Sequence, residues 1–215
     1  LWFKMESTIL INNCTFTSNK AMSSTSKGGA IYFDPECTSS VDITKTVFTK
    51  NSAIDGHALY LSHKLNYVNI TDSTIQSNGN INSSILSYCK ELRISNSLLG
   101  FGEYTLSNRA LYVLAKCHLI IENCQLINCF AQDVGSNGNG EGSGILYKVD
   151  ESISRDAANS DIEEDISITG TTFSNCRSSS NSETAGAAVT LYINSNITFE
   201  HNTISNCRKG SMILS

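Results

Sequence analysis

The chain has 215 residues, a formal net charge of -5 and a sequence pI near 5.3, so it lacks the basic surface that nucleic-acid binding normally needs. Charged residues make up only 16% of the chain, against about 25% in ordinary globular proteins, which argues against a helical bundle or a coiled coil. In their place stand 32 serines, 22 asparagines and 18 threonines, residue types that favour turns and caps over helix interiors. No apolar run approaches roughly 18 residues, so no transmembrane segment is predicted, and no signal peptide is visible.

An internal repeat runs from the first residues to the last. It has the form apolar-x-apolar-x-x-small-x-apolar-x-x-Asn/Cys, and its first copy places Ile9, Ile11, Cys14, Phe16 and Asn19 in these positions. Six further copies keep the offsets, with a glycine in the last position of the fourth, and begin at Val41, Val68, Leu92, Leu119, Ile166 and Ile197. The copies are 32, 27, 24, 27, 47 and 31 residues apart, periods that are typical of solenoids.

A second, strand-like element recurs between the copies, with Ile or Leu in its middle and usually Tyr at its end. It reads Ala30-Ile31-Tyr32, Ala58-Leu59-Tyr60, Ile85-Leu86-Ser87, Ala110-Leu111-Tyr112, Ile145-Leu146-Tyr147, Thr190-Leu191-Tyr192 and Met212-Ile213-Leu214. Alternation of apolar and polar residues over four to six positions has a period of two, which indicates strands rather than helices.

A helix-free unit of this size cannot bury its apolar side chains alone and must stack on its neighbours. We therefore predict an all-β fold, a parallel β-helix of about seven turns and about 34 Å in length at the usual strand spacing. Residues 1–215 then form one domain, with loop insertions in residues 130–165. Equivalent positions would stack into ladders, one of asparagines and one of tyrosines: Asn19, Asn51 and Asn78, and Tyr32, Tyr60, Tyr112, Tyr147 and Tyr192.

Two copies of the repeat also contain a recognisable sequence motif. Phe16-x-x-Asn19 is followed by Gly28-Gly29-Ala30-Ile31, and Phe48-x-x-Asn51 by Gly56-His57-Ala58-Leu59. This pattern resembles the FxxN and GGAI repeats of the chlamydial polymorphic membrane protein family, which also occur in surface proteins of other bacteria and of protists. The resemblance implies a right-handed parallel β-helix of the pectin-lyase-like type, exposed at the cell surface, with an adhesive or structural role.

Pectin-lyase-like folds include polysaccharide lyases and glycosidases, so the resemblance also raises the question of catalytic groups. A glycosidase needs two carboxylates that face one sugar bond, but Asp34, Asp42, Asp55 and Asp72 occupy different positions of the repeat. The run Asp55-Gly56-His57 is similar to a glycosidase loop, although we expect His57 to be a turn residue. No catalytic residue, metal site or cofactor is predicted.

The longest interval between copies contains two irregular segments, residues 133–144 and 149–165. The second is rich in acids: Asp150, Glu151, Asp156, Asp161, Glu163, Glu164 and Asp165. Oxygen ligands of this kind bind hard cations, but the spacing fits no calcium signature, so we expect a solvated loop.

Eight cysteines suggest an oxidising compartment. Cys89 and Cys117 are expected at the same corner of adjacent turns, and Cys129, Cys176 and Cys207 share one position on three successive turns. The sequence predicts at least one disulfide among these five, with small buried thiols as the alternative.

Four Asn-x-Ser/Thr motifs, at Asn13, Asn69, Asn82 and Asn196, are candidate N-glycosylation sites. Asn69 lies between two inward-facing residues, so it is expected to point outward, where a glycan could be carried.

The runs Leu1-Trp2-Phe3 and Ile213-Leu214-Ser215 fall on the same positions as Ile31-Tyr32-Phe33. We therefore expect open sheet edges at both ends, belonging to a segment of a longer repeat protein or to subunits that stack head to tail. The sequence favours a non-catalytic, extracellular structural or adhesive β-helix, a stalk, filament or adhesin. The alternative is a carbohydrate-active enzyme or a glycan-binding module of the pectin-lyase type. The expected partners are further copies of the same chain, or a longer chain, that stack head to tail on the open ends of the β-helix, and glycans.

Overall fold

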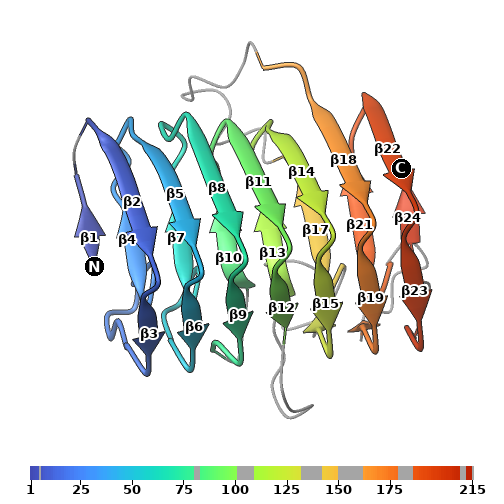
Figure 1. Cartoon of the computed structure of the whole chain (residues 1–215), viewed down its shortest axis with the longest axis horizontal. Helices are drawn as coiled ribbons and strands as arrows, with labels where there is room; N and C mark the ends of the chain where they lie inside the picture. The colour runs from blue at the N-terminus through green and yellow to red at the C-terminus, as the bar shows by residue number, and fades with distance from the viewer. Residues whose placement is uncertain are drawn as a thin grey trace.

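The computed structural model describes residues 1–4, 6–79, 83–100, 109–131, 142–149, 162–178, 186–208 and 212–214. Every regular element in these ranges is a β-strand (Figure 1). The strands belong to three long parallel sheets, named here sheets A, B and C, and to one pair of short strands. No helix in the described ranges is long and apolar enough to cross a membrane.

Sheet A has eight strands, and each pairs in parallel with the strand of the next turn. These are β1 (Trp2–Phe3), β4 (Ile31–Phe33), β7 (Leu59–Leu61), β10 (Ser83–Ser87), β13 (Arg109–Val113), β17 (Ile145–Lys148), β21 (Val189–Tyr192) and β24 (Met212–Leu214). The two short strands outside the long sheets are β16 (Phe130–Ala131) and β20 (Arg177–Ser178).

Sheets B and C have seven strands each. Sheet B consists of β2 (Thr8–Asn12), β5 (Ser40–Thr44), β8 (Tyr67–Thr71), β11 (Glu91–Ser95), β14 (His118–Glu122), β18 (Asp165–Thr169) and β22 (Asn196–Glu200). Sheet C consists of β3 (Thr15–Thr17), β6 (Val47–Thr49), β9 (Thr74–Gln76), β12 (Leu98–Gly100), β15 (Gln125–Ile127), β19 (Thr172–Ser174) and β23 (Thr203–Ser205).

The chain passes once through each sheet and then starts the next turn, so the molecule is a parallel β-helix of about seven turns, as predicted (Figure 1). The predicted repeat register is also confirmed in sheets B and C. Ile9 pairs with Val41 and Phe16 with Phe48, and the same positions continue to Ile197 and Ile204 at the other end.

The corner between sheets B and C has the same form in all seven turns. Two residues separate the strands, and the first of them has a positive φ: Asn13, Lys45, Asp72, Asn96, Asn123, Gly170 and His201. A second positive-φ bend follows sheet C at Ser18, Lys50, Ser77, Asn128, Asn175 and Asn206. Asparagine enters this left-handed region more easily than most residues, because its short polar side chain can hydrogen-bond locally. Part of the asparagine content of the chain is therefore explained by these bends.

The core is a column of Ile, Leu, Val and Phe side chains enclosed by the three sheets. Side chains of the inner turns, such as Ile70 and Phe173, are completely buried, whereas Phe16 in β3 and Phe199 in β22 are half-buried. Fully burying a side chain of this size contributes about 1.5 to 3 kcal/mol, so the inner turns supply most of the stabilisation.

Residues 130–165 were predicted to hold loop insertions. This range contains β16 and β17, and β17 is a regular strand of sheet A. Residues 132–141 and 150–161 lie outside the described residues, as do most of the predicted acidic segment and the candidate glycosylation site Asn82.

Candidate functional site

The small residue at each corner between sheets B and C belongs to a ladder of hydrogen bonds that runs along the solenoid. The Thr46 N–H donates to Ser73 Oγ and the Ser73 N–H donates to Ser97 Oγ, each at 3.1 Å. Each hydroxyl also donates to a backbone carbonyl two residues earlier in its own turn, from Thr46 to Thr44 and from Ser73 to Thr71. These side chains therefore hold adjacent turns together.

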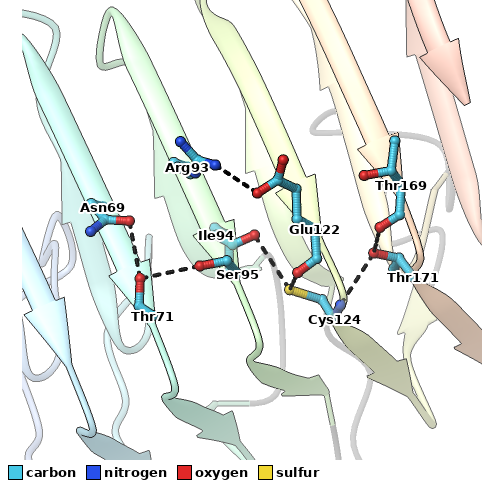
Figure 2. Close-up of polar contacts among 9 residues, drawn as sticks. All are labelled: Asn69, Thr71, Arg93, Ile94, Ser95, Glu122, Cys124, Thr169 and Thr171. Carbon is cyan, nitrogen blue, oxygen red and sulfur yellow. Dashed lines mark hydrogen bonds and ion pairs between the residues drawn. The ribbon is translucent and has the colours of Figure 1, made fainter.

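Figure 2 shows the same ladder where a cysteine replaces the hydroxyl. The Cys124 N–H donates to Thr171 Oγ1 at 3.3 Å, and the Cys124 thiol lies 3.4 Å from the carbonyl oxygen of Ile94 in the preceding turn. On the outer face of sheet B, the Arg93 guanidinium forms an ion pair of 2.7 Å with Glu122. The polar residues of this region pair with one another across neighbouring strands.

The predicted asparagine ladder is present beside sheet C. Asn19 Nδ2 donates to Asn51 Oδ1, and Asn51 Nδ2 donates to Asn78 Oδ1, both at 2.9 Å. The backbone N–H groups of Asn19 and Asn51 donate to the same oxygens at 3.1 and 3.0 Å. Asn51 and Asn78 also donate to the carbonyls of Phe16 and Phe48, so the two amides clamp three successive turns.

The tyrosine ladder of the prediction is correct only in part. Tyr32 pairs with Tyr60, but the same position in β10 is held by Leu86, which interrupts the ladder. Tyr112 occupies the same position in β13, where it pairs with Leu86.

Tyr147 and Tyr192 lie outside that position. Tyr147 pairs with Val113 and is completely buried, while Tyr192 pairs with Lys148. The Tyr147 hydroxyl accepts a hydrogen bond from the Cys117 N–H at 3.1 Å and donates to Glu164 at 3.3 Å, and burial raises the pKa of this phenol. Tyr147 is therefore a core residue with a hydrogen-bonded hydroxyl.

The predicted disulfides are not supported, because all eight cysteines are free thiols in the structure. The expected neighbours do meet: the Cys89 and Cys117 thiols interact, and Cys176 contacts both Cys129 and Cys207. In-register residues on parallel strands are about 4.7 to 4.9 Å apart with parallel Cα–Cβ bonds, whereas a disulfide needs Cβ atoms about 3.5 to 4.5 Å apart. The strand register brings these thiols together without the geometry of a bond.

Four of the thiols, those of Cys117, Cys124, Cys176 and Cys207, are held in their neutral form. Burial raises the pKa of Cys117 well above its usual value and that of Cys124 to about 11. The hydrogen bond with Cys129 is the main cause of the raised pKa of Cys176, and the hydrogen bond with Cys176 has the same effect on Cys207. Because a thiolate is the reactive form, they are arranged as packing groups rather than as nucleophiles.

The run Asp55-Gly56-His57 forms a corner before β7. His57 is 3% exposed, its Nδ1 accepts the Ala53 N–H at 3.1 Å, and its ring lies against Gly79, where an added Cβ would clash with the imidazole. His57 is thus packed into the corner, in agreement with the expected turn residue. Burial raises the pKa of the nearby Asp55 carboxyl, and the positive charge of Lys27 opposes this effect.

The other three aspartates that were considered as carboxylates of a glycosidase lie at different places in the fold. Asp42 faces Asn69 on the outside of sheet B, Asp72 occupies a left-handed bend, and Asp34 follows β4. In the described ranges, no three His, Cys, Asp or Glu side chains are grouped so that they could hold a metal ion.

Lys27 forms a contact that the sequence did not reveal. Its ammonium group lies 4.7 Å above the ring of Tyr60 and donates a hydrogen bond of 3.2 Å to the Tyr60 hydroxyl. Tyr60 also contacts the rings of Tyr32 and Tyr88, with centroids 5.3 and 5.7 Å away. A contact between a loop residue and a strand residue leaves no periodic pattern in the sequence. The only sequence signal near this contact is that Trp2, Tyr32 and Tyr60 occupy equivalent positions of the repeat.

The described glycosylation candidates differ in their surroundings. Asn69 points outward as expected, but its amide donates to Asp42 at 3.1 Å and accepts a hydrogen bond from Thr71 at 3.1 Å. Asn13 is exposed at a left-handed bend, and Asn196 is exposed at the start of β22. Asn13 and Asn196 are therefore more accessible to a glycosyltransferase than Asn69.

Compared with protein-family models, curated proteins and solved structures, the chain matches none of them. The resemblance to the chlamydial polymorphic membrane proteins therefore depends on the repeat residues alone.

Proposed function

We propose that the chain is a non-catalytic, extracellular structural or adhesive β-helix, a rigid surface stalk or adhesin of the pectin-lyase-like type. The observation that carries the proposal is that the asparagine, serine and threonine side chains of the ladders form hydrogen bonds between adjacent turns. Asn51 alone takes part in five hydrogen bonds that link three turns. Polar side chains that hydrogen-bond to adjacent turns stiffen the solenoid. The residues on its outer faces can then differ without loss of these bonds.

The surface location follows from the resemblance of Phe16-x-x-Asn19 and Gly28-Gly29-Ala30-Ile31 to repeats of bacterial surface proteins. To test it, intact source cells are labelled with an antibody against the chain and compared with permeabilised cells. Equal labelling of both is expected. Labelling that needs permeabilisation would contradict a surface role.

The non-catalytic role is tested by incubating the chain with cellohexaose and with polygalacturonate and measuring new reducing ends and unsaturated ends. No release above a heat-denatured sample is expected. Release that disappears in Asp55→Asn or Lys27→Ala would establish the alternative, a carbohydrate-active enzyme.

The outermost turns are candidate pairing surfaces for a further turn of the same repeat, from the same chain or from a second copy. At one end β3 exposes part of Phe16, and at the other β22 and β23 expose parts of Phe199 and Ile204. An unpaired parallel strand edge with apolar neighbours is a template for another strand. Light scattering of the purified chain over a range of concentrations should show association that Phe199→Asp reduces, whereas a concentration-independent monomer would exclude stacking between copies.

A further inference from the structure

The only tryptophan of the chain, Trp2, lies in β1 with 65% of its surface exposed. It pairs with Tyr32, which pairs with Tyr60, so three aromatic residues occupy the same position on neighbouring strands. The adjacent Phe3 and Phe33 stack on each other, and Phe33 is fully buried in the core. Trp2 and Tyr32 therefore belong to the outer surface of sheet A. Soluble proteins seldom expose large aromatic groups together unless the surface binds something.

The exposed indole is held in a fixed orientation. Its Nε1 donates to Asp34 Oδ2 at 3.2 Å, and Asp34 Oδ1 accepts the backbone N–H of Glu36 at 2.9 Å. A side chain fixed before binding loses less conformational freedom when a ligand arrives. The Trp2 side chain is therefore already oriented to contact a ligand.

Tyr32 and Tyr60 follow one another along the solenoid, with ring centroids 5.3 Å apart and the rings tilted by 47°. Tyr88, which follows β10 and lies outside the row, contacts Tyr60 at 5.7 Å. The step from Tyr32 to Tyr60 is close to the length of one pyranose unit in an extended glycan. Because the C–H face of a pyranose is apolar and its rim carries hydroxyls, a sugar fits an aromatic ring flanked by polar groups.

Polar groups flank the row on both sides. Lys27 is exposed, and its ammonium group covers Tyr60, which is itself nearly buried. The ammonium can donate to sugar hydroxyls, and the Asp34 carboxylate can accept from them.

The formal charges around the row favour a neutral ligand. The charged side chains that act on this area are Lys4, Lys27, Lys64, Asp34, Glu36 and Asp55, three cations and three acids that sum to zero. Lys4 and Glu36 are paired with each other at 2.7 Å. These six side chains give an acidic polysaccharide no net attraction.

We propose that Trp2, Tyr32 and the Lys27–Tyr60 pair form a binding track for a neutral, extended oligosaccharide that lies along the solenoid axis. One sugar ring stacks on Trp2 and the next on Tyr32, while Lys27 and Asp34 exchange hydrogen bonds with their hydroxyls. This inference rests on the proposed adhesive function and names its ligand class.

The single tryptophan makes the test direct, since its fluorescence comes from the site itself. The full chain is titrated with cellohexaose and chitohexaose, and separately with polygalacturonate. A saturable change of Trp2 emission is expected with at least one neutral glycan, and Tyr32→Ala should weaken that binding at least tenfold. The matched control is Tyr67→Ala on the outer face of sheet B, which should bind as the parent chain does. Thermal melting of each variant verifies that the fold is retained.

Three results would overturn the proposal: no saturable change with either neutral glycan, a response to polygalacturonate alone, or the same loss of affinity in Tyr67→Ala as in Tyr32→Ala. None of them would affect the scaffold proposal, which is tested by surface labelling and by the absence of polysaccharide cleavage. Conversely, permeabilisation-dependent labelling would refute the surface role even if the track binds glycans.

Discussion

The position that follows sheet C is occupied by asparagine in the first three turns and by cysteine in turns near the C-terminal end. Asn51 and Asn78 donate to carbonyls of the preceding turn at 2.9 and 3.0 Å. Cys176 and Cys207 direct their thiols at the equivalent carbonyls, but at 3.7 and 3.9 Å. The same place in the fold is therefore a hydrogen-bond clamp in one half and a weakly bonded apolar contact in the other. A parallel β-helix needs a small side chain here, and either kind of interaction can follow.

The largest effect is expected from Asn51→Ala. The change removes the acceptor for Asn19 and the donor for Phe16, and it leaves buried polar groups without partners, which should lower the free energy of unfolding by about 3 kcal/mol. Cys176→Ala, the matched change in the cysteine half, should cost only about 1 kcal/mol, because a thiol forms weak hydrogen bonds. Urea unfolding of both variants measures the difference. Equal losses would show that the two halves are held in the same way.

A second effect is expected at alkaline pH. It distinguishes a corner thiol, that of Cys124, from a corner hydroxyl, that of Thr171. Burial raises the pKa of Cys124 to about 11, whereas an unfolded thiol titrates near about 8.5. The unfolded state therefore loses its proton first, so this stabilisation is complete below about pH 8.5 and is lost as the pH rises towards about 11. The loss should be of the order of 3 kcal/mol, and Cys124→Ser should remove this part of it, whereas Thr171→Ser should not. Melting temperatures across this pH range check the prediction, and an unchanged slope in Cys124→Ser would contradict it.

A third variant moves the amide into the cysteine half. In Cys176→Asn the new amide lies between Cys129 and Cys207, which cannot complete an amide ladder, so a loss of about 1 to 2 kcal/mol is expected. Replacing all three cysteines by asparagine should recover most of that loss. If the triple variant is less stable than the single one, the cysteine half has a shape that asparagine cannot fill. Urea midpoints of the two variants decide between these outcomes.

The smallest effect is expected on the outer face of sheet B. Arg93 and Glu122 form an ion pair, but water reaches both side chains, which are 42% and 34% exposed. Arg93→Ala should cost less than about 1 kcal/mol, and high salt should reduce the difference further. A larger loss, measured in the same unfolding experiment, would mean that outer-face pairs contribute as much as the inner ladders.

The sequence predicts sheets B and C almost completely, because their offsets never change. Ile9, Ile11, Cys14 and Phe16 define a spacing that every later copy repeats, and a fixed corner keeps the strands in phase. Sheet A is less predictable. The run Ile145-Leu146-Tyr147 is apolar at each position, so its pattern does not say which side chain faces inward, and a shift by one residue exchanges the two faces. Tyr147 is predicted in the ladder of Tyr32 and Tyr60 for this reason, although it pairs with Val113 and lies in the core.

The contact between Lys27 and Tyr60 could not be predicted, because it depends on how an irregular loop folds over the next turn. The missing disulfides have another cause. The sequence places Cys129, Cys176 and Cys207 correctly in one row, but the parallel strands hold their side chains side by side instead of directing them at one another.

The constant corner between sheets B and C also determines where the chain can grow. Two residues connect these sheets in every turn, whereas β17 and β18 are separated by the segment between Lys148 and Asp165, and β7 and β8 only by that between Leu61 and Tyr67. Because the B–C corner has the same length in every turn and keeps the strands in register, segments of very different length can enter or leave sheet A without disturbing the stack. Foreign peptides should therefore be accepted between sheets A and B and rejected between sheets B and C, which makes the solenoid a frame for displaying inserted loops.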